Sequence, residues 1–224
     1  MPAQEAILSL LATSANEYRS LAVIWHLGLA TLLVSLVVGW RPQTRAVGYL
    51  LAAPIISVSA VAWAAGNPFN GTTFAVLALL LIGIARTLPE EAVDIASRTV
   101  LLPGAGLVAF GSTYPHFLEA NHWTAYVYAA PFGLLPCPTL SAVIGLTLAL
   151  GLWRSQSWGL TLAIAGGIYG VIGVFALGVV LDYGLVAGAL LLGITVAISR
   201  FAGRPRKHGS SRSTLPHATS TRPI

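Results

Sequence analysis

Seven runs of mainly apolar residues follow one another along the chain, and short polar stretches separate them. The runs cover residues 21–40, 46–65, 72–88, 99–114, 137–153, 158–177 and 180–199. A transmembrane helix needs about 20 largely apolar residues, and each run comes close to that length. The pattern therefore predicts an all-α bundle of seven transmembrane helices whose outer surface is solvated by lipid.

The two ends of the chain differ from this apolar middle. Residues 1–19 carry closely spaced Leu and Ile side chains but lack the basic start of a secretory signal. We expect them to stay uncleaved and to form a short helix on the membrane surface. Residues 20–199 form the predicted transmembrane domain. Residues 200–224 are rich in Ser, Thr, Pro and Arg with little to bury, which predicts a basic, disordered cytoplasmic tail.

Pro89, Glu90, Glu91 and Asp94 form an acidic patch between the third and fourth runs. A proline followed by acidic residues is typical of the first turn of a helix, where negative charge stabilises the helix dipole. We therefore expect a short surface helix at this point of the chain.

The positions of the basic residues orient the predicted bundle. With seven spans, eleven of the twelve Lys and Arg residues fall on the side of the C-terminus, and Arg19 alone falls on the other side. Cytoplasmic loops of membrane proteins carry an excess of Lys and Arg. The arrangement thus predicts an outward N-terminus and a cytoplasmic C-terminus.

Composition narrows the classes of function. Hydrophobic residues make up 56% of the chain and charged residues 8%, against about 25% charged residues in a typical soluble domain. The net charge of +5 owes much to the tail, because six of the twelve Lys and Arg residues lie in the last 25 positions. This distribution predicts contact with the lipid bilayer and not with nucleic acid. Without a nucleotide-binding loop or a zinc-protease motif, the sequence predicts neither an enzyme nor a cofactor.

The stretch from 113 to 140 holds the most unusual residues. Pro131, Pro136 and Pro138, with Gly133 among them, cannot all lie in one regular helix, because each proline removes a backbone donor and clashes with the preceding turn. Residues 129–138 are therefore expected to be extended or broken, although they are apolar enough to enter the outer leaflet. Irregular backbone at that depth persists where protein or a water-filled cavity shields it. This predicts an outward-facing pocket.

Several side chains are candidates to line that pocket. Thr139 and Ser141 fall in the first turn of the next helix, where they either hold a polar group of a solute or only cap the helix. Cys137, the single cysteine, is either a reactive thiolate near a helix start or a packed, inert thiol. The full set of candidate ligand-binding residues is Gly133, Pro136, Cys137, Pro138, Thr139, Ser141, His26 and Asp182.

His116, Glu119 and His122 are spaced by three residues, which on a helix would bring imidazole and carboxylate groups to neighbouring positions. Pro115 argues against a long helix here, and the headgroup region commonly holds such residues. We therefore predict solvated loop side chains and no metal site, and keep a metal site on these three residues as a weaker alternative.

Small residues recur at close-packing intervals in the last two runs. Gly166 and Gly170 are four residues apart, as are Gly184 and Gly188. Such spacing lets helix backbones approach closely. It predicts tight packing within one chain, with a homodimer through these faces as the alternative.

One combination of residues resembles a known group of proteins. It consists of Tyr18, Ile24-Trp25, Trp40-Arg41-Pro42, Asn67-Pro68, Tyr114-Pro115, Phe132-Gly133 and Pro136-Cys137-Pro138-Thr139. Over about residues 15–200 the chain resembles a bacterial family of multi-span membrane proteins of unknown function, whose members are sometimes labelled permeases. The chain departs from that family in having His26 where a proline is usual, and in a longer linker around residues 116–122. The resemblance implies the bacterial cytoplasmic membrane and no particular activity.

Together these patterns predict a small permease or solute-binding membrane protein with an outward-facing pocket near the Pro-Cys-Pro-Thr segment. Two alternatives remain open at this stage. One is a membrane enzyme or a redox or metal sensor that acts through Cys137. The other is a structural membrane subunit without catalytic activity.

Overall fold

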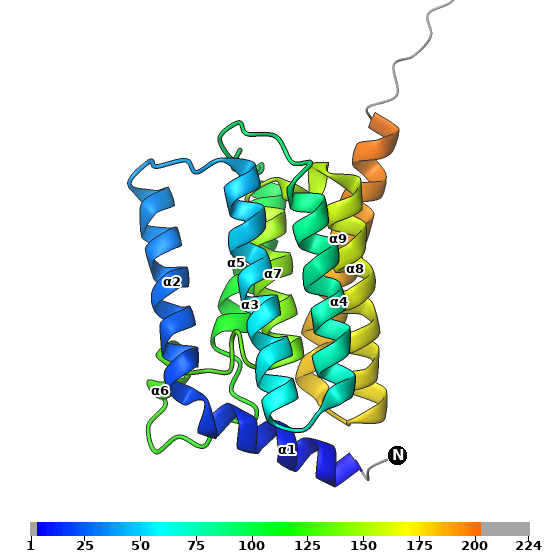
Figure 1. Ribbon diagram of the computed structural model, residues 1–224. Helices are drawn as coiled ribbons and strands as arrows, with labels where there is room; N and C mark the ends of the chain where they lie inside the picture. The colour runs from blue at the N-terminus through cyan, green and yellow to red at the C-terminus, as the bar shows by residue number, and fades with distance from the viewer. Residues whose placement is uncertain (1–3, 203–224) are drawn as a thin grey trace, which may run out of the picture.

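The computed structural model describes residues 4–202, and within that range the protein is all-α, without a β-strand (Figure 1). The predicted tail beyond Ala202 lies outside the described residues. The α-helices are α1 (Gln4–Glu17), α2 (Arg19–Val37), α3 (Thr44–Ala64), α4 (Pro68–Ala85), α5 (Arg98–Ser112), α6 (Ala125–Tyr128), α7 (Pro136–Ala149), α8 (Gln156–Val171) and α9 (Tyr183–Ala202). Shorter turns are η1 (Leu152–Arg154), η2 (Ile172–Ala176), which is a π-helix, and η3 (Val180–Asp182).

Five helical segments in the described part of the chain are long and apolar enough to cross a membrane. They are Arg19–Val37, Thr44–Ala64, Pro68–Ala85, Gln156–Ala176 and Val180–Phe201. Each of the seven predicted apolar runs contains a helix, but α5 has 15 residues and α7 has 14. At about 1.5 Å per residue such helices are about 21–23 Å long, shorter than the roughly 30 Å hydrocarbon core of a bilayer.

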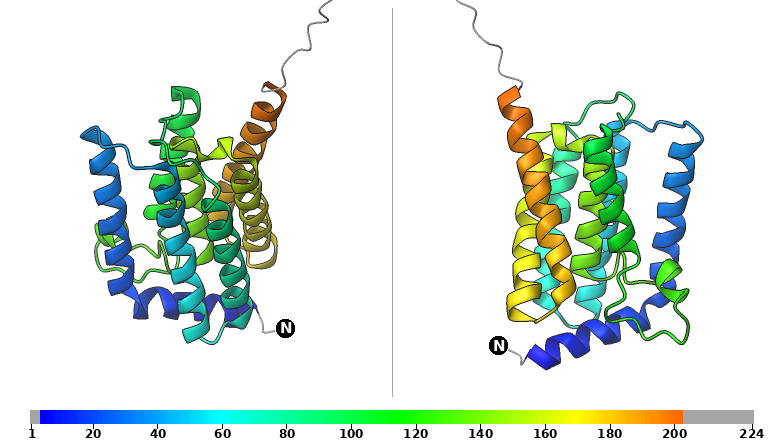
Figure 2. Two further views of the ribbon diagram at one scale, coloured as in Figure 1. Left: turned by 45° about the horizontal axis from the view of Figure 1, so that its top comes forward. Right: turned by 180° about the vertical axis from the view of Figure 1, so that it is seen from behind.

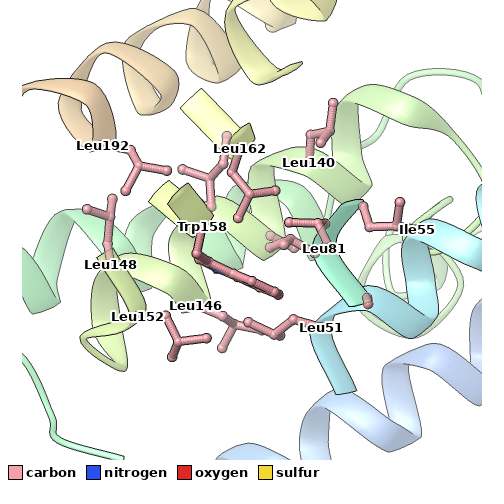
Figure 3. Close-up of a cluster of buried hydrophobic side chains, with 14 of the residues drawn as sticks. Leu51, Ile55, Leu81, Leu140, Leu146, Leu148, Leu152, Trp158, Leu162 and Leu192 are labelled. Atoms are coloured by element: carbon pink, nitrogen blue, oxygen red, sulfur yellow. The ribbon is translucent and has the colours of Figure 1, made fainter. Parts of the chain in front are cut away.

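The short helix α7 forms the centre of the bundle. Thirteen of its 14 residues are buried, which fits a helix that is apolar on all sides. Its side chains Leu140, Leu146 and Leu148 meet Trp158 and Leu162 of α8 in the main hydrophobic cluster (Figure 3). Because neighbouring helices cover α7, it has no need to reach both surfaces of the membrane.

Glycines bring the backbones of α5 and α7 into contact. A Cβ atom on Gly104 would lie 2.8 Å from the carbonyl oxygen of Gly145, and one on Gly111 would lie 2.5 Å from that of Pro138. A Cβ on Gly145 would in turn lie 2.5 Å from the oxygen of Gly104. Only hydrogen fits at these positions, so α5 packs backbone to backbone on the first and last turns of α7.

The glycines of α8 and α9 also face residues of the same chain. A side chain on Gly166 would meet Ile144 of α7, and one on Gly170 would meet Val186 of α9. On α9, Gly184 faces Phe110 and Gly188 faces Leu107, both on α5. Packing within one chain accounts for the spacing of these four glycines, and the homodimer through them stays a prediction.

The N-terminal helix predicted from residues 5–19 is present as α1, and it crosses beneath the bundle at a steep angle to the other helices (Figures 1 and 2). Its Ala15 packs with Val61 of α3 and with Leu134 and Leu135. The Asn16 side chain donates to the carbonyl oxygen of Phe117 at 3.0 Å and accepts from the amide of Glu119 at 2.9 Å. These bonds tie α1 to the loop between α5 and α6.

The predicted surface helix around Glu90, Glu91 and Asp94 is wrong. Residues 89–97 form an extended connection, and their backbone groups bond to distant segments instead of to one another. The amide of Val93 donates to Pro42, and that of Ala96 donates to Ala149 at the end of α7. Pro89 and the acidic side chains suited a helix locally, but these long-range backbone bonds satisfy the segment without one.

The connections divide between two ends of the bundle. The α2–α3 connection, the α4–α5 connection and the last turns of α9 lie at the top of Figure 1. The helices α1 and α6 and the α3–α4 turn lie at the bottom. Two ion pairs lie within the upper connections, Arg45 with Glu90 and Arg154 with Asp94. The stretch from 113 to 135 therefore shares an end with the N-terminal helix and is far from the last turn of α9.

Candidate functional site

The entry to α7 is broken as its prolines predict. Residues 129–135 are turns and bends, and the helix begins at Pro136, slightly earlier than expected. Pro136 and Pro138 both lie in the first turn, where a missing backbone N–H breaks no bond within the helix. Two prolines so close together thus mark a helix start at this point.

Gly133 turns the chain sharply against α2. Its φ is +77°, and a Cβ atom there would collide with Cδ1 of Trp25. Its backbone amide donates to Oγ1 of Thr139 at 2.9 Å, and Ser141 donates to the carbonyl oxygen of Cys137 at 2.9 Å. Thr139 and Ser141 are 0% and 1% exposed. Both hydroxyls therefore bond to the protein's own backbone in this structure.

Little space remains beside the Pro-Cys-Pro-Thr segment. Leu134, Leu135 and Pro136 border a cavity of about 10 Å³ between α1 and the bundle. This cavity has room for about one water molecule. The remaining walls come from α1, from the end of α3 and from the α3–α4 turn. The segment shapes the interior, while the larger cavity of the protein lies nearby, against α2.

A buried acid lies where three parts of the chain meet. Asp182, at the end of η3, is 2% exposed, and its Oδ1 accepts a hydrogen bond of 2.7 Å from the hydroxyl of Tyr114. Tyr114 follows the end of α5 and is 1% exposed. Burial, and then the neighbouring Asp182 carboxylate, raise the pKa of the Tyr114 hydroxyl well above its usual value. Tyr114 therefore keeps its proton and acts as the donor.

A π-helical turn makes room for this carboxylate. Gly173 lies in η2, and a Cβ atom there would lie against Oδ2 of Asp182, closer than any van der Waals contact allows. The amide of Val179 donates to the carbonyl oxygen of Gly173, which closes the turn between η2 and η3. π-Helical turns often mark functional sites.

Cys137 completes the surroundings of the acid. It is the one residue of α7 that is not fully buried, and it lies close enough to Asp182 for each group to affect the charge of the other. The structure therefore brings together two of the predicted site residues, Cys137 and Asp182, from positions 45 residues apart. Cys137 faces a carboxylate and no histidine base, an arrangement that does not favour a thiolate.

A larger cavity of about 280 Å³ lies between α2, the end of α5 and α6. Its walls are mainly apolar, with His26, Ser112 and Tyr128 as the polar groups. The remaining lining residues are Val23, Leu27, Leu29, Ala30, Leu33 and Val127. Only 17% of the apolar stretch of α2 is buried inside the protein, against 56% for that of α3. In Figure 1, α2 stands apart from the bundle. The cavity is thus bounded by a helix with little protein behind it.

His26 joins α2 to the bundle at the edge of this cavity. It is 8% exposed, with Nδ1 lying 2.8 Å from the carbonyl oxygen of Ala22 and Nε2 lying 2.7 Å from that of Ser112. Both partners are acceptors, so a neutral ring with one N–H bonds to one of them and a doubly protonated ring bonds to both. The ring also packs edge-on against Phe132, next to Gly133.

Comparison of the chain with models of protein families, with curated proteins and with solved structures gives no match. The interpretation of both sites therefore rests on their own residues and geometry.

The loop histidines do not assemble a metal site. Residues 113–124 are not helical, so the three-residue spacing of His116, Glu119 and His122 does not align their side chains. Among residues 4–202, no three His, Cys, Asp or Glu side chains lie close enough together to hold a metal ion. His116 packs against Phe117, and the amide of Glu119 is held by Asn16.

The sequence did not identify three residues that belong to these sites. Tyr114 was read as the end of a span, and Gly173 carried no signal because its role depends on Asp182 of the next segment. Tyr128 stands outside the set of candidate residues, although it lines the α2 cavity. A buried acid without a basic neighbour in the sequence, such as Asp182, is a signal that calls for a tyrosine donor elsewhere in the chain.

Proposed function

We propose that this protein is a small permease or solute-binding protein of the bacterial cytoplasmic membrane, and that its solute is an amphiphile bound in the α2 cavity. The observation that carries this proposal is the cavity of about 280 Å³ with mainly apolar walls and a few polar groups. That size approaches the lower end of ligand pockets, which is about 300 Å³.

The lining favours a molecule with an apolar chain and a hydrogen-bonding head. Leu27, Leu29 and Leu33 offer contacts to a hydrocarbon chain. Tyr128 offers a hydrogen bond to a hydroxyl or carboxyl group. A fully charged solute would lose its water of hydration without a charged partner in the lining, which is costly. An amphiphile in the bilayer also reaches this cavity past α2 without crossing the bundle.

We further propose seven spans with an outward N-terminus, in which α5 and α7 are short inner spans. Support comes from the loops, because the described connections that carry Arg41, Arg45, Arg86, Arg98 and Arg154 share one end of the bundle. The cavity would then open into the outer leaflet, near the Pro-Cys-Pro-Thr segment and linked to it through Phe132 and Gly133.

The two alternatives have less structural support. A thiol mechanism needs an activated Cys137, and this thiol faces a carboxylate without a second cysteine in the chain. A purely structural subunit would leave the α2 cavity without a role. Membership of the bacterial family that carries the Pro-Cys-Pro-Thr motif also remains a proposal.

The test is photolabelling of the full-length protein in liposomes with a diazirine-bearing fatty acid, followed by peptide mapping. We expect saturable labelling of α2 and α6 that an unlabelled fatty acid competes away. Ala30→Phe fills the cavity and should reduce this labelling at least tenfold. Ile24→Phe is the matched control, because Ile24 lies on the same helix, is 62% exposed and does not line the cavity.

Two results would overturn the proposal. One is labelling that never saturates, which is the behaviour of bulk lipid on any exposed helix face. The other is equal labelling of the Ala30→Phe and Ile24→Phe variants.

A further inference from the structure

Asp182 is a carboxyl group that the fold buries without a basic partner. It is 2% exposed, and the ion pairs within residues 4–202 join other residues, Arg45 with Glu90 and Arg154 with Asp94. A buried carboxylate without a countercharge is costly in protein and more so in a membrane. Ionisable groups in that situation are retained where they bind or carry a charge.

The groups around Asp182 hold it in a defined geometry. Oδ1 accepts from Tyr114 at 2.7 Å, and Oδ2 lies against Gly173. Cys137 lies near the same carboxylate. The Tyr114 donor stabilises an ionised carboxylate, whereas burial favours the neutral acid. These opposed effects suit a group that changes its protonation state.

We propose that Asp182 is a proton-binding site, at which Oδ2 forms an O–H bond with a proton taken up from water and later returns it. The inference does not depend on the α2 cavity, since it concerns different residues.

The surroundings favour a proton over a metal cation. Hard cations such as Mg²⁺ and Ca²⁺ take six or more oxygen ligands. Here the oxygen atoms of side chains are those of Asp182 and Tyr114, and the third neighbour is the thiol of Cys137, a soft ligand unsuited to hard cations. A proton needs one oxygen atom and no coordination shell.

The titratable groups that face Asp182 come from two neighbouring segments. They are Tyr114 and, at longer range, His116 from the α5–α6 loop, and Cys137 from α7. The π-turn η2 contributes Gly173 and no titratable side chain.

Infrared spectroscopy of the full-length protein in liposomes tests the proposal. The chain has two aspartates, so ¹³C-aspartate labelling leaves two carboxyl bands to assign. We expect the carbonyl band of a protonated carboxylic acid to appear and disappear with pH, and to be lost in Asp182→Asn. Asp94→Asn is the matched control, because Asp94 is exposed and paired with Arg154, and it should leave that band in place.

The single cysteine supplies a second, independent readout in the unmodified chain. The S–H stretching band of Cys137 should shift with the same midpoint as the carboxyl band, because the nearby Asp182 carboxyl group changes its charge. Tyr114→Phe should move that midpoint. The proposal is overturned if Asp182 stays in one protonation state over the whole pH range in which the protein remains folded, or if the S–H band does not move with it. The wild-type S–H readout decides the matter even if Asp182→Asn fails to fold.

Discussion

The Tyr114 hydroxyl donates a hydrogen bond of 2.7 Å to the Asp182 carboxylate, joining residues 68 positions apart. The bond links the end of α5 to the start of α9, and both partners are buried. It is therefore a tertiary contact whose loss leaves a buried acceptor without its donor.

Tyr114→Phe removes this donor and keeps the ring, which packs against Phe110. We expect the free energy of unfolding to fall by about 1–3 kcal/mol, the usual cost of leaving a buried polar group unsatisfied. Denaturation with sodium dodecyl sulfate in mixed micelles measures it. Tyr183→Phe is the control, since Tyr183 is 54% exposed and should change stability by less than about 0.5 kcal/mol. Equal effects of the two substitutions would contradict the prediction.

Gly133→Ala places a methyl group against the Trp25 ring at a backbone angle that L-residues rarely adopt. We expect a loss of about 2 kcal/mol or more, because overpacking and strain act together. The Trp25 indole donates to Ser57 at 2.9 Å, so tryptophan fluorescence should report its displacement. Gly83→Ala is the control, because nothing lies within 4 Å of its position. A fully stable Gly133→Ala variant with unchanged fluorescence would refute this account of the turn.

Gly173→Ala tests the space that the π-turn leaves for Asp182. The added methyl group collides with the carboxylate, and we expect the free energy of unfolding to fall by about 1–3 kcal/mol. The carboxyl infrared band should also shift. Gly167→Ala, nearby on α8 with nothing within 4 Å, should leave both stability and band unchanged. If the two variants behave alike, the close contact of Asp182 with Gly173 does not contribute to the free energy of unfolding, and the prediction is wrong.

Single-cysteine labelling in intact cells tests the proposed topology. In a Cys137→Ser background, a cysteine at His122 should react with a membrane-impermeant maleimide, because the loop faces outward. A cysteine at Glu91, in the opposite connection, should react only after the cells are lysed. Both positions are exposed, so accessibility within the protein does not distinguish them. The reverse pattern would invert the proposed orientation.

Most of the helical pattern was predictable, because apolar runs long enough for a membrane specify helices whatever packs beside them. The run at 137–153 gave no sign that α7 would be central and covered on all sides. That property comes from glycines on α5 and from Trp158 and Leu162 on α8, which no local pattern connects. The structure of the segment from Pro89 to Asp94 was not predictable for the same reason, since its backbone bonds to Pro42, Thr44 and Arg45, which are distant in the sequence.

The site was predictable in part. The break before Pro136 follows from proline chemistry and is present. Asp182 and Cys137 were singled out separately, but their proximity depends on how α9 packs on α7. The α2 cavity was not foreseen, because it results from α2 standing apart from the bundle while His26 bonds α2 to the end of α5.

The burial of α7 also has a consequence for how the protein is made. During synthesis α7 emerges before α8 and α9, and until they follow, the face of α7 that packs on Trp158 and Leu162 lacks its protein neighbours. Lipid can cover this face, but a 14-residue helix is too short to reach both headgroup layers. We therefore expect the insertion machinery to retain α7 until α8 and α9 arrive. A chain truncated after Arg154 should be a substrate for membrane proteases rather than a stable fragment.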